Sequence, residues 1–226
     1  MRKKLILLLL IVCAISLTGC VRTGDGIKFK TEYESLNGKK TDDGKHKYRS
    51  ISIDKKNKIK YATCSDIVDM MEKKKSFVVY FGFDKCPWCR SVLEELIRAG
   101  KDSSIDTIYY VDVYDVRDVK EFKDGKVVTT KKGDSSYMKL VDMMGGVLDD
   151  YTVDDNSMGE KRIYAPNVVA VIHGKADKMT TGISDKLTDP YMKLNKSIKN
   201  YAYKNFKCMM KCVTDSKTVC TKDSKC

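Results

Sequence analysis

Two cysteines stand two residues apart in the segment Cys86-Pro87-Trp88-Cys89. A CxxC pair between an apolar strand and a helix is typical of thiol–disulfide exchange. The first cysteine would lie at the helix N-terminus, where unpaired backbone N–H groups and the helix dipole stabilise a thiolate. We therefore expect Cys86 to form a mixed disulfide with a substrate, and Cys89, one turn along the helix, to resolve it.

The residues on either side of this motif predict the elements that hold it. The expected strands are apolar runs, and the expected helices repeat apolar residues three and four positions apart. A capping box at Thr63 and Asp66 would begin the first helix. The predicted elements are a strand at 58–61, a helix from this box to about 75, a strand at 77–83, a helix from the CxxC motif to about 100 and a strand at 107–113.

A long charged segment, from about 116 to 162, separates these elements from the rest of the predicted fold. One helix is expected in it, at 135–151, with Gly145-Gly146 weakening its middle. The elements expected after it are a strand at 167–172, a turn at Gly174-Lys175, a hairpin partner at 177–183 and a helix from about Asp189-Pro190 to Phe206, with the proline in its first turn.

The N-terminus predicts export. Three basic residues precede an apolar stretch at 5–17, which is too short for a permanent membrane span, and the stretch ends in Leu17-Thr18-Gly19-Cys20. This pattern resembles a bacterial lipoprotein signal, in which residues 1–19 are removed and Cys20 is lipidated. An ordinary secretory signal with a chance cysteine is the alternative.

Lipidation would attach the chain to a bilayer. Two acyl chains on Cys20 are enough for stable anchoring, which predicts a location on the extracytoplasmic face of the bacterial cell membrane. Residues 20–56 are polar and contain few apolar side chains. We expect them to form a flexible tether between the lipid and the folded domain.

The remaining cysteines fit an oxidising compartment, where disulfides persist. Cys64 is expected to be a small buried apolar residue. Four cysteines lie in a tail at 207–226 and are expected to form two structural disulfides of unknown pairing, with a zinc site as the alternative. These four are Cys208, Cys212, Cys220 and Cys226.

The formal net charge is +12, and lysines are spread along the chain among acidic residues. Nucleic-acid binding would need a focused basic patch or a recognised module, and the sequence has neither, so no nucleic-acid partner is expected. A solvated lysine-rich surface, or a basic surface beside an anionic membrane, accounts for the charge.

The motif, the element order and a late proline together resemble the thioredoxin-like superfamily over residues 57–206. The resemblance implies an α/β fold with a central mixed sheet flanked by helices, a helical insert at 116–162 and a Cys-rich C-terminal tail. It also implies that the bond between Ala165 and Pro166 is cis and lies against the CxxC pair, and that the backbone of Ala165 aligns the substrate chain. A proline at a strand edge is the alternative reading.

Several neighbours of the cysteines differ from the family pattern. Tyr80 occupies the position where thioredoxins carry a buried acid, so proton transfer at Cys89 must use another group or water. The Pro-Trp dipeptide is nearer to that of glutaredoxins. Lys85 is placed to favour a thiolate, and Trp88 is expected either to contact substrate or to pack against the insert. These differences predict an intermediate reduction potential.

Together these features predict a membrane-anchored protein-disulfide oxidoreductase that acts on secreted or surface proteins. Its partners would be disulfide-containing protein substrates, a membrane redox partner and the lipid bilayer, and it would need neither a metal nor another cofactor. Two alternatives stay open. The first is a non-catalytic accessory or binding lipoprotein, for example in peptide or bacteriocin secretion, whose cysteine pair is an oxidised clasp. The second is a metal-handling protein.

Overall fold

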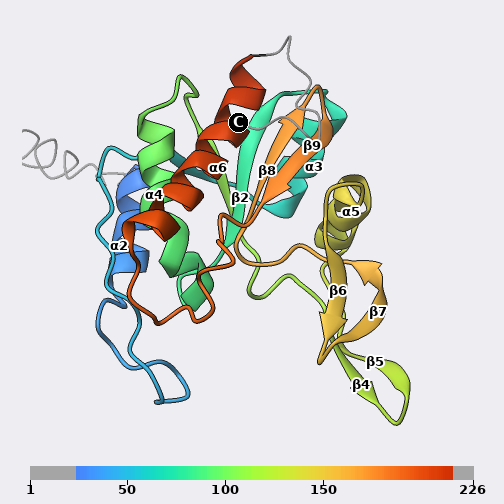
Figure 1. Cartoon of the computed structure of the whole chain (residues 1–226). Coiled ribbons are helices and arrows are strands. Elements are labelled where there is room, and N and C mark those ends of the chain that lie inside the picture. Colours follow the sequence, from blue (N-terminus) through green and yellow to red (C-terminus); the bar gives the residue numbers. More distant parts are fainter. Residues whose placement is uncertain (1–23, 216–226) are drawn as a thin grey trace, which may run out of the picture.

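The computed structural model describes residues 24–215 of the 226-residue chain (Figure 1). The predicted signal at 1–19, the lipidation site Cys20, and the tail cysteines Cys220 and Cys226 lie outside the described residues. None of the helices in residues 24–215 is long and apolar enough to cross a membrane.

A five-stranded mixed sheet forms the centre of the fold, with the spatial order β1-β3-β2-β8-β9. The strands β1, β3 and β2 are parallel, β8 is antiparallel to β2, and β9 is antiparallel to β8. The prediction of an α/β fold with a central mixed sheet flanked by helices is confirmed. The strands are β1 Ile59–Tyr61, β2 Phe77–Gly82, β3 Ile108–Asp112, β8 Asn167–Ile172 and β9 Lys175–Thr180.

Helices cover both faces of this sheet, as Figure 1 shows. On one side lie α2 Asp25–Glu34, α4 Pro87–Lys101 and α6 Lys196–Thr214, and on the other lie α3 Cys64–Glu72 and α5 Ser135–Met144. The capping box predicted for α3 is present, since Thr63 and Asp66 exchange side-chain and backbone hydrogen bonds.

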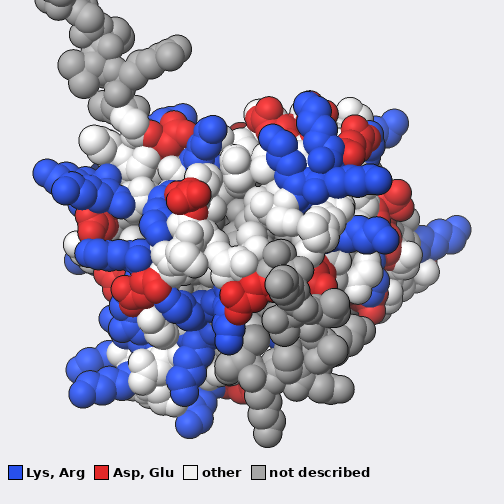
Figure 2. All heavy atoms as spheres, turned by 90° about the horizontal axis from the view of Figure 1, so that it is seen from above, with Lys and Arg blue, Asp and Glu red and all other residues white. Residues whose placement is uncertain are grey.

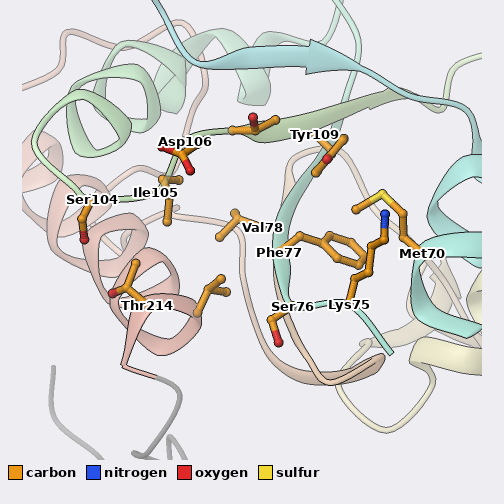
Figure 3. A pocket seen from close by; sticks show the side chains of 12 residues that line it. Met70, Lys75, Ser76, Phe77, Val78, Ser104, Ile105, Asp106, Tyr109 and Thr214 are labelled. Atoms are coloured by element: carbon orange, nitrogen blue, oxygen red, sulfur yellow. The ribbon is translucent and has the colours of Figure 1, made fainter. Parts of the chain in front are cut away.

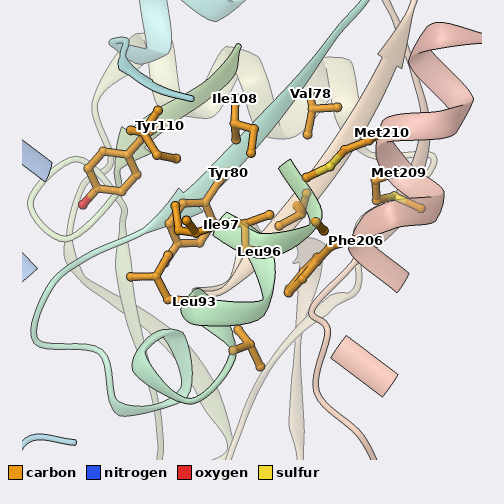
Figure 4. Packing of buried hydrophobic residues seen from close by; sticks show 14 of the residues in the cluster. Val78, Tyr80, Leu93, Leu96, Ile97, Ile108, Tyr110, Phe206, Met209 and Met210 are labelled. Atoms are coloured by element: carbon orange, nitrogen blue, oxygen red, sulfur yellow. The ribbon is translucent and has the colours of Figure 1, made fainter. Parts of the chain in front are cut away.

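Strand β2 is the most enclosed element, and every one of its residues is buried. Because side chains alternate across a strand, Val78 and Tyr80 point towards α4 and α6 (Figure 4), whereas Val79 and Phe81 join the cluster with α3 and α5. This burial on both faces explains why the sequence of β2 is a continuous apolar run.

Residues 24–56 belong to the fold, so the predicted flexible tether is wrong for this part of the chain. Helix α2 buries Phe29 and Tyr33 completely, and Ile51 and Ile53 further along the segment are also buried. The segment is polar on average, but its few apolar residues are spaced to reach one side of the core. Phe29 and Tyr33 stand four apart, on one helix face.

The insert is less helical than predicted. Helix α5 ends at Met144, with Gly145 as its C-cap residue, and two β-hairpins flank it (Figure 1). Their turns, Asp124-Gly125 and Asp154-Asp155, have positive φ at both residues, as two-residue hairpin loops require. The hairpin strands are β4 Val119–Lys123 with β5 Lys126–Lys131, and β6 Asp150–Val153 with β7 Asn156–Lys161.

The last helix also differs from the prediction. It begins at Lys196, where the Asn195 side chain accepts the N–H of Ile198 at 3.0 Å, and residues around Pro190 form a turn instead. It continues to Thr214 and buries Cys208 and Cys212 among core residues. The predicted tail at 207–226 therefore begins inside the hydrophobic core rather than outside it.

Candidate active site

Cys86 stands at the carboxyl end of β2 and is the N-cap residue of α4. Its sulfur accepts the backbone N–H of Cys89 at 3.1 Å, so a donor at the helix start points at this sulfur. Pro87 fills the first helical position, where a missing N–H costs nothing. Such a donor and the helix dipole stabilise negative charge on the sulfur.

The cysteine pair is in its dithiol form, and both thiols are buried. Cys86 is 3% exposed and Cys89 has no exposed surface. The third free thiol among the described residues, Cys64, lies in α3 on the opposite face of the sheet. It is buried, as predicted, and burial raises its pKa to about 11. It does not belong to this site.

Ala165 and Pro166 precede β8, the strand that pairs with β2, and the bond between them is cis. The thiol of Cys86 donates a hydrogen bond to the carbonyl oxygen of Ala165, with 3.3 Å between sulfur and oxygen. The structure thus brings together the two segments that the resemblance implies, although about 80 positions of sequence separate them.

Cys89 faces the core beneath Cys86. Burial raises the pKa of its thiol well above the usual range, and the hydrogen bond and charge of Cys86 act in the same direction. Hydrogen bonds from the Phe83 backbone and the Tyr80 hydroxyl act in the opposite direction. The Tyr80 hydroxyl in turn lies 3.2 Å from that of Tyr33, and both tyrosines are fully buried.

Lys85 is paired with an acid rather than directed at the sulfur. Its ammonium lies 2.9 Å from the carboxylate of Asp42, and both side chains are exposed. This pair lowers the pKa of Asp42 and raises that of Lys85. Since Asp42 comes from the segment predicted to be a tether, this contact could not be predicted from the sequence.

A turn at residues 189–192 contacts α4 near the N-terminus of this helix. The Pro190 carbonyl accepts hydrogen bonds from Ser91 at 2.9 Å and from Arg49 at 2.8 Å, and Arg49 also donates to Met192. Tyr191 in this turn is half-buried and stacks on His46. Burial raises the pKa of its hydroxyl, and negative charge on nearby acidic groups and on Cys86 acts in the same direction. Sequence reasoning missed this contact because no local pattern links residues so far apart.

Arg90, directly after Cys89, was also missed. It is 1% exposed, and its guanidinium donates only to oxygens of uncharged groups. These are the carbonyls of Arg49, Tyr33 and Asp84 and the side-chain oxygen of Asn37, at 2.7–3.1 Å. Arg90 therefore ties the N-terminal segment to both the helix start and the loop before Cys86.

Trp88 is only partly exposed, and both expectations for it, substrate contact and packing, stay open.

Cys208 and Cys212 are disulfide-bonded. Within residues 24–215, no group of three or more histidine, cysteine, aspartate or glutamate side chains is placed to hold a metal ion.

A cavity of about 410 Å³ opens at the amino end of β2 (Figure 3), whereas Cys86 follows the carboxyl end of this strand. Phe77, Tyr109 and Thr214 are among its lining residues.

Lys and Arg side chains alternate with Asp and Glu over the face that Figure 2 shows. This mixed distribution agrees with a solvated lysine-rich surface.

No protein-family model matches this chain, and the comparison with curated proteins gives no match. Its function is therefore inferred from the geometry of the site.

Proposed function

We propose that this chain is a protein thiol–disulfide oxidoreductase with a thioredoxin-like fold. The observation that carries the proposal is the position of the Cys86 sulfur, which lies between the N–H of Cys89 and the carbonyl of Ala165. The parallel order β1-β3-β2, followed by the antiparallel hairpin of β8 and β9 after a proline, supports the fold assignment.

The proposed reaction has two exchange steps. The Cys86 thiolate attacks one sulfur of a substrate disulfide, which forms a mixed disulfide and releases the other substrate sulfur as a thiolate. Cys89 then attacks the Cys86 sulfur, its proton passes to the second departing substrate sulfur, and a disulfide between Cys86 and Cys89 remains. Two electrons have moved to the substrate with two protons, one from Cys89 and one, through solvent, that Cys86 lost on becoming a thiolate. The reverse sequence oxidises a substrate dithiol.

A membrane redox partner would restore the pair after each turnover, and Cys20 would hold the chain on the extracytoplasmic face of the membrane. Since α2 begins at Asp25, only residues 21–24 separate the lipidated position from the fold. Four residues extend at most about 14 Å. The folded domain would therefore lie directly beside the bilayer, close to other membrane-bound partners, rather than at the end of a long tether.

The test is the dithiol-dependent reduction of insulin by residues 21–226, beside the variant Cys86→Ser. We expect the wild type to accelerate the reaction and Cys86→Ser to match the uncatalysed rate. The matched control is Cys64→Ser, which removes a buried thiol on the other face of the sheet and should keep the activity. Equal rates for the wild type and Cys86→Ser would overturn the proposal.

A further inference from the structure

Cys89 must become a thiolate in a site that burial makes unfavourable for charge. It has no exposed surface, so water cannot solvate the charge. The titratable groups that act on it are Cys86 at its own helix start, Tyr80 from β2 and Tyr33 from α2. The neighbouring guanidinium of Arg90 is occupied by carbonyl oxygens and by Asn37.

The Tyr80 hydroxyl, which interacts with the Cys89 thiol, is fixed in place by its neighbours. Its ring stacks on that of Tyr110, with centroids 5.5 Å apart, and lies in the core beside α4 (Figure 4). Gly82, two residues further along β2, leaves the space for the hydroxyl, because a methyl group at position 82 would overlap it. The absence of a side chain at Gly82 therefore allows Tyr80 its position.

Tyr33 fixes the hydroxyl of Tyr80 from the other side. The two oxygens are 3.2 Å apart, and neither tyrosine is exposed to solvent. One hydroxyl of such a pair donates to the other. If Tyr33 donates to Tyr80, the proton of Tyr80 is free to point at the Cys89 sulfur.

We propose that Tyr80 is a catalytic hydrogen-bond donor to Cys89 in the resolving step, and that Tyr33 is the positioning residue that aims it. The inference rests on the proposed function. When Cys89 attacks the mixed disulfide, the hydroxyl of Tyr80 donates to the developing thiolate and keeps its own proton. The proton of Cys89 passes to the departing sulfur, or to solvent where that sulfur leaves as a thiolate. Hydrogen bonds to charged groups are about twice as strong as neutral ones, so the donor favours the charged sulfur over the thiol.

The test uses 5,5′-dithiobis(2-nitrobenzoate) as a small disulfide substrate with the reduced chain of residues 21–226. Attack by Cys86 releases one coloured thiolate, and attack by Cys89 on the mixed disulfide releases the second, so absorbance follows both steps separately. Tyr80→Phe should leave the first phase within about two-fold and slow the second by roughly ten-fold or more at pH 7. Its pH profile should move to higher pH, since a bond that favours the thiolate is lost.

Tyr33→Phe should slow the second phase by a smaller factor, about three-fold. Gly82→Ala keeps every hydroxyl but displaces that of Tyr80, and should slow the same phase, which tests the proposal even if Tyr80→Phe folds poorly. Tyr137→Phe is the matched control, because Tyr137 is a buried tyrosine on the other face of the sheet. It should change neither phase.

The inference is wrong if Tyr80→Phe and Gly82→Ala keep the second phase within two-fold of the wild type, or if Tyr137→Phe slows it equally. Two other results would contradict the proposed function itself. One is a wild type that shows no second phase, and the other is a Cys86→Ser variant that releases both coloured thiolates at the wild-type rates.

Discussion

The rings of His46 and Tyr191 stack face to face, with centroids 4.0 Å apart and planes 5° apart. His46 comes from the N-terminal segment and Tyr191 from the turn before α6. Because Arg49 and Ser91 hold the carbonyls of that turn, the stack is fixed beside the start of α4. Tyr191 is close enough to Cys86 for the two groups to interact electrostatically, and Cys86 is only 3% exposed.

Replacement of Tyr191 by alanine should therefore expose the Cys86 thiol. We expect iodoacetamide to alkylate Cys86 at least about three-fold faster in Tyr191→Ala, because reactivity depends on access as well as on thiolate character. His46→Ala should act in the same direction, since it removes the ring on which Tyr191 rests. The rates are measured by mass spectrometry of the Cys86 peptide.

The control for this experiment is Tyr201→Ala, which removes an exposed tyrosine from α6, away from the pair. It should leave the alkylation rate unchanged. Equal rates for Tyr191→Ala and the wild type would show that the stack does not shield Cys86.

The ion pair between Lys85 and Asp42 should moderate the reactivity of Cys86. Asp42→Asn removes a negative charge and leaves the Lys85 ammonium unpaired, so the potential near Cys86 becomes more positive and favours its thiolate. We expect faster alkylation of Cys86 at pH 7 and a more oxidising reduction potential. Lys85→Met should have the opposite effect. The reduction potentials of both variants are measured against glutathione buffers of known potential.

Salt provides the check on this electrostatic argument. Both side chains are exposed, so their influence should largely vanish in 1 M NaCl, where the Debye length is about 3 Å. If the rate for Asp42→Asn differs from that of the wild type by the same factor at low and high salt, a change of structure rather than of charge is responsible.

The sequence predicted the elements that carry the cysteine pair because their signals are local. The apolar run of β2, the Thr63 capping box and the position of the CxxC pair at a helix start each depend on a few adjacent residues. The hairpins of the insert also had a local signal, since Asp124-Gly125 between β-branched and aromatic residues favours a two-residue turn. The high charge of the segment hides this turn signal, because charged residues are uncommon in strands.

The surroundings of the site could not be predicted in this way. Tyr33 meets Tyr80, Asp42 meets Lys85 and His46 meets Tyr191 only through the tertiary fold. The N-terminal segment supplies one partner in each contact, and its polar composition hid this role. A helix of ten residues with only two buried side chains has a weak amphipathic pattern, and packing rather than propensity stabilises it.

Arg90→Met should test how firmly this segment is held. The substitution leaves the carbonyls of Tyr33, Arg49 and Asp84 without their buried donor, so the free energy of unfolding should fall by about 3 kcal/mol or more. Urea denaturation measures the change, and trypsin should cut within residues 24–56 sooner than in the wild type.

Lys101→Met is the matched control on the same helix. Its ammonium is exposed and pairs with Asp54 at 3.2 Å, and surface pairs contribute about 0–1 kcal/mol. A loss in Arg90→Met no larger than in Lys101→Met would mean that the N-terminal segment is held by apolar packing alone.

Cys64 should make the stability of the fold depend on pH in the alkaline range. Burial, with a smaller contribution from the charge of Asp134, raises its pKa from 9.0 to about 11. As pH rises from 9 to 11, the thiol ionises in the unfolded chain before it does so in the folded one. Its contribution to stability is therefore complete below pH 9. As the pH rises to 11, the free energy of unfolding falls by about 2 kcal/mol.

Cys64→Ala removes this group and should be less stable than the wild type at pH 7, because it leaves a small cavity in the core. The difference between the two proteins should shrink by about 2 kcal/mol between pH 9 and 11. Urea denaturation at several pH values measures it, and all other titrating groups cancel because both proteins share them. A difference that stays constant over this range would show that the Cys64 thiol ionises as readily in the folded protein as in the unfolded chain.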